Sequence, residues 1–149
     1  RLSVSHFHWG QTMSSDGRKP RVVVADDENH CRVLMKAVLS SMKCEVVGEA
    51  RTGDEALEVY RRLRPNLLLL DVNMPIKNGD EVLEELFEEF PEAFVIVLTS
   101  VTDMESIEKC ISMGAANYIR KDTPVSEIKM IIKDTWRSFL ERKSKVAVG

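Results

Sequence analysis

The sequence contains no long hydrophobic run, and no stretch of its 149 residues approaches the length of an apolar helix that crosses a membrane. It also lacks an excess of positive charge. The formal net charge is -3, so there is no electrostatic reason to expect nucleic-acid binding. The glycine-rich phosphate motifs GxGxxG and GxxxxGKS/T are both absent, which argues against the nucleotide sites that they form. We therefore expect a cytoplasmic protein that binds neither membrane nor nucleic acid directly.

Cysteine is scarce as well. Cys31, Cys44 and Cys110 are odd in number and do not have the spacing of a metal site. We expect them to be buried or half-buried free thiols rather than a disulfide framework.

The first twenty residues have no hydrophobic periodicity and no apolar run of the kind that a signal peptide needs. We expect residues 1–20 to form a disordered tail, contributed by upstream sequence or added outside the natural gene, and Met13 is a candidate natural start. His6 and His8 in this segment are candidate metal ligands, although two histidines in a flexible tail are usually inert.

From Arg21 onward, short β-branched or leucine-rich runs alternate with amphipathic helical segments. The predicted strands are Arg21–Ala25, Cys44–Gly48, Asn66–Leu70, Ala93–Leu98 and Ala115–Ile119. The inner face of the first helix is predicted to carry Leu34, Ala37, Val38 and Met42, and a helix from about Thr102 is predicted to end at Gly114. Five strands alternating with five helices predict an α/β fold with a doubly wound parallel sheet, covered on both faces.

Polar residues stand where the predicted strands end. Asp26 and Asp27 follow the first strand, Asp71 the third and Thr99 the fourth, while Lys121 comes two residues after the fifth. A doubly wound sheet places its ligand site at the carboxyl ends of its strands, so these side chains are predicted to meet. One aspartate here would usually be only a helix cap, but a pair of aspartates together with Asp71 is harder to explain in that way.

Three crowded carboxylates need a cation or a proton between them. Mg²⁺ suits an all-oxygen set better than zinc does, because no His or Cys falls at these strand ends. A metal beside a carboxylate suggests phosphoryl transfer, in which Asp71 would be the nucleophile. Lys121 and the hydroxyl of Thr99 would then contact the phosphoryl oxygens.

These residues resemble the receiver domains of bacterial two-component response regulators. The similar segments are VVVADDE, LLLLDVNMPIKNGDE, VLTS and GAANYIRK, followed by a final amphipathic helix, all in the family's order. The resemblance covers residues 21–143 and leaves residues 144–149 as a C-terminal tail. It implies the flavodoxin-like (CheY-like) fold with strand order 2-1-3-4-5.

The resemblance also implies roles for individual residues. Asp71 would accept the phosphoryl group from a histidine kinase or a phosphotransfer protein. One Mg²⁺ would be bound directly by Asp27, Asp71 and the carbonyl of Asn73, with Asp26 acting through a metal-bound water. The domain would be no enzyme in the ordinary sense, catalysing only its own phosphorylation and slow dephosphorylation.

The family's conformational switch corresponds here to Thr99 and Tyr118. The surface formed by the fourth helix, the fifth strand and the fifth helix would change on phosphorylation and signal a partner, an output domain or a second copy. We expect Trp136 on the last helix to be partly exposed on this surface.

Two positions depart from the family's pattern. Its lysine is commonly followed by proline, often after a cis bond, whereas Asp122 follows Lys121 here, so we expect a trans bond. The stretch Lys121–Pro124 (KDTP) resembles receivers that precede helix-turn-helix DNA-binding domains. Val101, two residues after Thr99, cannot orient water, which predicts a long-lived phosphoryl group.

Three alternatives compete with this interpretation. A haloacid-dehalogenase-like phosphatase would need an acidic residue where Asn73 stands and a cap domain, for which the chain leaves little room. The second alternative concerns the source of the domain. It is either a stand-alone regulator or a receiver domain that belongs to a longer transcription factor or hybrid kinase. The third alternative is a degenerate receiver that never takes phosphate. Such a domain would lack one of the residues that phosphorylation requires, whereas this sequence has all of them.

Overall fold

The computed structural model describes residues 18–148, so residues 1–17 of the expected tail, with His6 and His8, lie outside the described part. The strands are β1 (Arg21–Ala25), β2 (Glu45–Ala50), β3 (Leu67–Asp71), β4 (Val95–Thr99) and β5 (Asn117–Arg120). The helices are α2 (Asn29–Ser41), α3 (Gly53–Leu63), α4 (Gly79–Glu89), α5 (Glu105–Met113) and α6 (Val125–Val148), with the short 3-10 helix η2 (Val101–Asp103) before α5.

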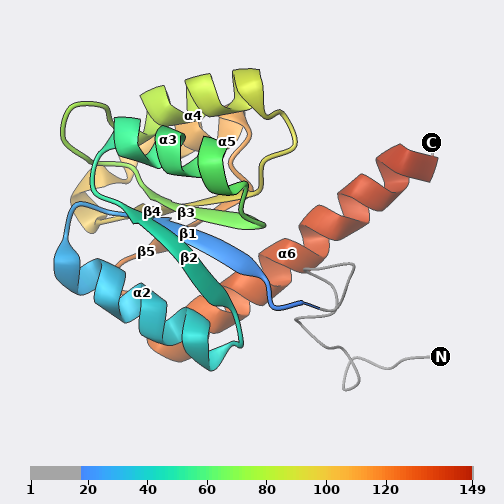
Figure 1. Cartoon of the computed structure of the whole chain (residues 1–149), viewed down its shortest axis with the longest axis horizontal. Helices are drawn as coiled ribbons and strands as arrows, with labels where there is room; N and C mark the ends of the chain where they lie inside the picture. The colour runs from blue at the N-terminus through green and yellow to red at the C-terminus, as the bar shows by residue number, and fades with distance from the viewer. Residues whose placement is uncertain (1–17, 149) are drawn as a thin grey trace.

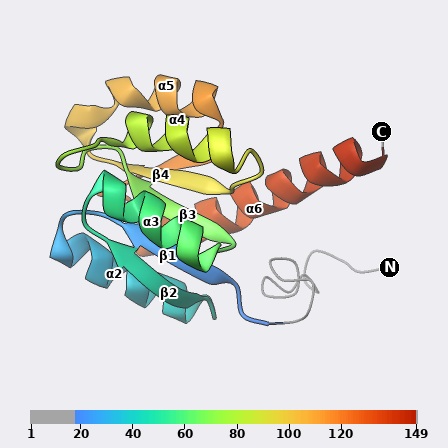
Figure 2. The same cartoon turned by 45° about the horizontal axis from the view of Figure 1, so that its top comes forward.

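The strands form one parallel sheet in the order β2-β1-β3-β4-β5. Helices α3, α4 and α5 cover one face of the sheet, and α2 and α6 cover the other (Figures 1 and 2). The doubly wound α/β fold and its strand order, expected from the sequence, are therefore confirmed.

The central strand β3 shows why the chain folds in this way. Its residues Leu67–Leu70 have no exposed surface. Leu68 and Leu70 pack into the core beneath α3, α4 and α5, while Leu67 and Leu69 pack into the core beneath α2 and α6. Side chains alternate between the two faces of a strand, so a continuous leucine run is what a sheet covered on both sides requires.

The ends of the strands differ from the predicted ends by one or two residues in most cases. The strand predicted at Asn66–Leu70 is Leu67–Asp71, and β4 extends to Thr99. The reason is that Asp71 still pairs with Leu98, and Thr99 with Arg120, in the parallel ladder. The polar residues at the carboxyl edge are thus held by the backbone of the sheet.

The prediction of which residues form the inner face of α2 was partly wrong. Leu34 is 39% exposed and Ala37 is also exposed, whereas Met35 and Leu39 point into the core with Val38. The apolar residues of this helix cover more than one face, so periodicity alone did not decide which face meets the sheet.

The last helix, α6, is 24 residues long and extends past the sheet (Figure 1). The expected domain end at residue 143 lies inside this helix. The expectation that Trp136 is partly exposed is wrong, because this side chain is only 6% exposed. Its ring packs against Phe94 and Phe139, with centroids 4.7 and 5.4 Å away, so it belongs to the core.

The expectations for the cysteines and for the loop after Lys121 are confirmed. Cys31, Cys44 and Cys110 are buried thiols that form no disulfide. The described residues contain no cis peptide bond, so the bond between Lys121 and Asp122 is trans.

Candidate functional site

The carboxyl edge of the sheet gathers the polar residues that the sequence singled out. Asp26 and Asp27 follow β1, Asp71 ends β3, Thr99 ends β4, and Lys121 follows β5. Parallel strands end on the same edge, so segments far apart in the chain meet here.

Three carboxylates form the centre of this edge. Oxygen atoms of Asp26, Asp27 and Asp71 lie within 4.8 Å of one another. Asp26 and Asp71 are buried, with 0% and 2% exposure, whereas Asp27 is exposed. The cluster therefore opens to solvent on the side of Asp27.

The carboxyl group of Asp71 is hard to ionise in this setting. Burial raises its pKa to about 7, and the charge of Asp26 adds to the rise. The N–H of Asn73, which donates to Asp71 Oδ1 at 3.1 Å, and the charge of Lys121 oppose it. A buried carboxylate in this state favours a nearby cation.

Lys121 supplies positive charge to the cluster from the opposite side of the site. Its Nζ lies 2.9 Å from Asp26 Oδ2, 3.2 Å from Asp71 Oδ2 and 2.8 Å from Glu28 Oε1. Burial alone would lower the pKa of Lys121, but the hydrogen bonds to Glu28 and Asp26 outweigh it and hold this pKa above its usual value. Lys121 therefore stays charged.

Two residues that hold this arrangement received no role from the sequence. Glu28 contacts Lys121, and its backbone N–H donates to Asp26 Oδ1 at 2.9 Å. The buried Arg32, 3% exposed, donates from Nη1 to the carbonyl of Asp26 at 2.6 Å and from Nε to Glu49 at 3.1 Å. The sequence offered only a weak signal for Arg32, which is a charged residue five positions after Asp27 and three positions before Met35.

The loop after Asp71 is held close to the strand end by a glycine. The N–H of Gly79 donates to the carbonyl of Val72 at 2.9 Å, and a Cβ at Gly79 would lie 2.7 Å from Val72 Cα. Any side chain here would push the start of α4 away from the site. This close approach gives the glycine of the segment LLLLDVNMPIKNGDE a physical role.

Thr99 and Tyr118 lie on the neighbouring strands β4 and β5, where Thr99 pairs with Arg120 at the carboxyl edge and Tyr118 pairs with Val97. Thr99 has no exposed surface, and its hydroxyl donates to the carbonyl of Ser100 at 3.0 Å. Tyr118 is half-buried and packs against the core beneath α3, α4 and α5. The side chain of Val101 lies outside the part of the chain that the structure describes.

The donor set at this edge fits a hard divalent cation. All three clustered side chains offer carboxylate oxygens, which Mg²⁺ prefers. Asp26 Oδ2 is buried and lies 2.9 Å from the Lys121 ammonium. A cation bound among the aspartates would offset their mutual repulsion.

The rest of the described chain offers no transmembrane candidate. No helix among residues 18–148 combines the length and the apolar character that spanning a bilayer requires.

Comparisons with known proteins agree with the fold. A family model described as "Response regulator receiver domain" matches residues 22–133. The chain is 32% identical over 108 residues to the chemotaxis protein CheY of Thermotoga maritima, covering 72% of this chain and 90% of that protein. It is 37% identical over 109 residues to the uncharacterized transcriptional regulatory protein YhcZ of Bacillus subtilis, covering 72% of this chain but 51% of that protein.

Among solved structures, the signal receiver domain of the putative response regulator NarL from Mycobacterium tuberculosis superposes with a TM-score of 0.73. The two chains are 32% identical, and the match covers 80% of this chain and 98% of that one. Because the family model covers residues 22–133 and the fold agrees with it, the chain belongs to the receiver domains of two-component response regulators.

Proposed function

We propose that the chain receives a phosphoryl group on Asp71 from a histidine kinase or a phosphotransfer protein and signals this event to a partner. The observation that carries the proposal is the position of Asp71 at the end of the central strand, within 4.8 Å of the other two aspartates and 3.2 Å from the Lys121 ammonium. A carboxylate in this position has a cation on one side and an opening to solvent on the side of Asp27.

In the proposed reaction, a carboxylate oxygen of Asp71 attacks phosphorus as the bond from phosphorus to the donor nitrogen or oxygen breaks. The product is an acyl phosphate, and the donor leaves with the electron pair of the broken bond. Lys121 is already charged and close enough to pair with a phosphoryl oxygen, which offsets the charge on the transferred group. Thr99 would donate its hydroxyl to another oxygen after leaving Ser100.

We also propose that Asp26, Asp27, Asp71 and the carbonyl of Asn73 hold one Mg²⁺. When bound, this ion neutralises charge on the phosphoryl oxygens. The protein's own contribution is to keep the carboxylates in place through the Asp26 and Asn73 backbone contacts.

The surface of α5, β5 and α6 is our proposed output, switched through Thr99 and Tyr118. Phosphorylation can shift such an equilibrium only if the phosphoryl group interacts better with one state, and the Thr99 and Lys121 contacts would supply this difference. The partner is a protein surface, an output domain or a second copy. YhcZ, of which the chain spans about half the length, supports a longer transcriptional regulator acting in the cytoplasm.

The test is incubation of the full chain with acetyl phosphate, with and without Mg²⁺, followed by intact mass measurement. We expect the wild type to gain one phosphoryl group only with the metal, and Asp71→Asn to gain none. Asp134→Asn is the matched control, because Asp134 is an exposed aspartate on α6 away from the site, and it should label like the wild type. Equal labelling of Asp71→Asn would overturn the proposal.

A further inference from the structure

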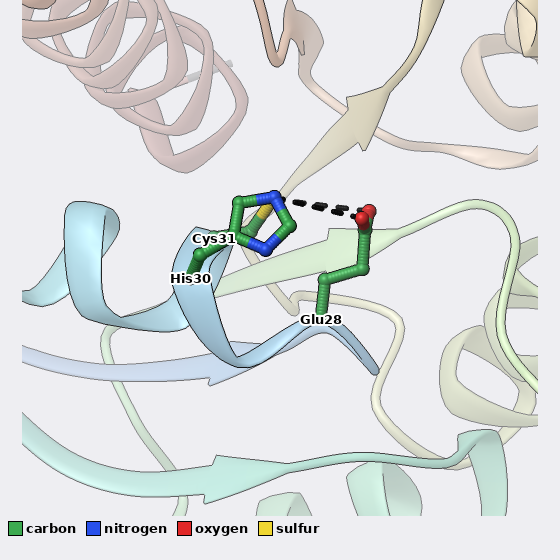
Figure 3. A group of neighbouring side chains, drawn as sticks. All are labelled: Glu28, His30 and Cys31. Carbon is green, nitrogen blue, oxygen red and sulfur yellow. Dashed lines mark hydrogen bonds and ion pairs between the residues drawn. The ribbon is translucent and has the colours of Figure 1, made fainter.

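A second group of metal-type ligands lies beside the aspartate cluster, at the start of α2. The side chains of Glu28, His30 and Cys31 converge on one another (Figure 3). One ligand atom from each residue lies within 4.8 Å of the other two. His30 Nε2 is 3.6 Å from Glu28 Oε2, and Cys31 Sγ is 3.8 Å from Glu28 Oε1. None of the three belongs to the Asp26, Asp27 and Asp71 group.

These separations are close to those of a formed tetrahedral zinc site. Zinc binds His nitrogen and carboxylate oxygen at about 2.0–2.2 Å and Cys sulfur at about 2.3 Å, so its ligand atoms lie about 3.3–3.7 Å apart. The 3.6 Å separation of His30 Nε2 and Glu28 Oε2 lies inside this range, and the 3.8 Å separation of Cys31 Sγ and Glu28 Oε1 lies just outside it. Rotation of the exposed His30 and Glu28 side chains, 80% and 46% accessible, is enough to close the difference.

We propose that Glu28, His30 and Cys31 form a zinc-binding site with three protein ligands and a fourth position open to water or an external ligand. The nitrogen, sulfur and oxygen set favours zinc or a similar transition ion over Mg²⁺, which prefers oxygen alone. The site is chemically distinct from the all-carboxylate edge, and it does not depend on phosphorylation of Asp71.

Lys121 gives the site an outer contact that orients one ligand. Its Nζ holds Glu28 Oε1 at 2.8 Å, and the other oxygen of Glu28 faces His30. Metal-binding carboxylates are commonly fixed by such outer partners, which hold the ligand in position before the metal arrives. Zinc on Oε2 would thus leave the Lys121 contact to Oε1 in place.

The charges of the proposed site balance. Burial raises the pKa of the Cys31 thiol to about 11, so the free thiol keeps its proton at neutral pH. On binding, the S–H bond breaks, the proton passes to solvent and a zinc–sulfur bond forms. One thiolate and one carboxylate then neutralise the dication, so the positive end of the α2 dipole imposes little penalty.

The experiment is a titration of the full chain with Co²⁺ as a spectroscopic probe, in saturating Mg²⁺ so that the aspartate edge is occupied. We expect one equivalent of Co²⁺ to produce the sulfur-to-cobalt charge-transfer band and the visible bands of tetrahedral cobalt, and one equivalent of Zn²⁺ to remove them. Cys31→Ser should abolish the charge-transfer band. His30→Ala and Glu28→Gln, which change exposed side chains, should each weaken binding at least tenfold.

Matched controls separate this site from the other candidates. Cys44→Ser and Cys110→Ser remove the other two buried thiols, and the double variant His6→Ala/His8→Ala removes the histidines outside the described residues. All three should keep the wild-type spectrum. Absence of the charge-transfer band in the wild type, its persistence in Cys31→Ser, or undiminished affinity in both His30→Ala and Glu28→Gln would overturn the proposal.

Discussion

The two parts of β3 differ in polarity although both are buried. Leu67–Leu70 are apolar and fully buried, and Asp71, the next residue, is almost equally buried but can carry a charge. Burial stabilises the leucines, each by about 1.5–3 kcal/mol, whereas burial of an ionised carboxylate costs free energy. The strand therefore changes from a stabilising to a destabilising segment within one residue.

The same contrast extends across the sheet. Val22–Val24 and Val95–Leu98 fill the interior of neighbouring strands with no exposed surface, while Asp26 and Thr99, just beyond these runs, are polar and equally buried. The core stabilises a fold that holds three carboxylates closer together than they would lie in water. The burial of the core therefore offsets the cost of holding these carboxylates together, and the contacts of Lys121 and Arg32 position them.

The largest effect should come from the core. We expect Leu69→Ala to lower the free energy of unfolding by about 3 kcal/mol, because it leaves a cavity between the sheet and the helices α2 and α6. Urea denaturation measures the change. Leu34→Ala, which truncates a leucine 39% exposed on α2, is the control and should cost less than about 1 kcal/mol. An equal loss of unfolding free energy in the two variants would contradict the distinction between the buried Leu69 and the exposed Leu34.

The next largest effect should come from filling the acidic edge. At a Mg²⁺ concentration about 100 times the dissociation constant, we expect the free energy of unfolding to rise by about 2.7 kcal/mol. Asp27→Asn should remove most of this gain, because Asp27 is the exposed member of the carboxylate group and its replacement disturbs no packing. Thermal unfolding in Mg²⁺ and in EDTA measures both. If Asp27→Asn keeps the full Mg²⁺-dependent rise in unfolding free energy, the ion does not bind at the three aspartates.

A smaller effect concerns pH in the absence of divalent cations. The pKa of Asp71 is about 7 in the folded chain against 3.8 for the free side chain, so the folded state binds this proton more tightly. The stability that the protonated form contributes is fully present below about pH 4 and is lost as the pH rises through 7. Asp71→Asn should remove this loss and be more stable than the wild type by about 1–2 kcal/mol at pH 8.

Urea denaturation at pH 5 and pH 8 measures the difference in unfolding free energy between Asp71→Asn and the wild type. The titrations of other groups largely cancel in this difference. Asp134→Asn should follow the wild-type pH dependence. A variant that is less stable than the wild type at pH 8 would show that Lys121 compensates fully for the burial of the carboxylate.

The smallest effect should come from an ion pair outside the site. Arg61 Nε lies 2.9 Å from Glu89, as close as the contacts of Lys121, but both side chains are more than 40% exposed. We expect Glu89→Gln to change the free energy of unfolding by less than about 0.5 kcal/mol, since water screens this pair. Chemical denaturation in low and high salt checks it. A change above 1 kcal/mol would contradict the distinction between surface and site charges.

The fold was predictable because its main signals are local. Leu67–Leu70 had to be buried on both faces, and the alternation of strands with helices predicted the doubly wound parallel sheet, whose strand order the family resemblance implied. Trp136 and Leu34 show where such signals fail. Each lies on a helix with more apolar residues than one face requires, so only packing against the sheet decided that Trp136 is buried and Leu34 exposed.

The site divides in a similar way. Asp26, Asp27, Asp71 and Lys121 were predictable because each follows a strand and parallel strands end together. Glu28 and Arg32 were not assigned a role, because their partners, Lys121 and Glu49, are 93 and 17 residues away. A single sequence contains no measure of which side chains meet across such separations.

By itself, the sequence determined which segments become strands, that the sheet is covered on both faces, and which carboxylates stand at its carboxyl edge. These features depend on the order of apolar and polar residues along the chain, which is a local property of the sequence. Only the tertiary structure decided that Lys121 contacts Glu28 as well as two aspartates, that Arg32 supports Asp26, and that Glu28, His30 and Cys31 converge. Distances between side chains depend on how helices dock on the sheet, and docking is decided by the whole core at once.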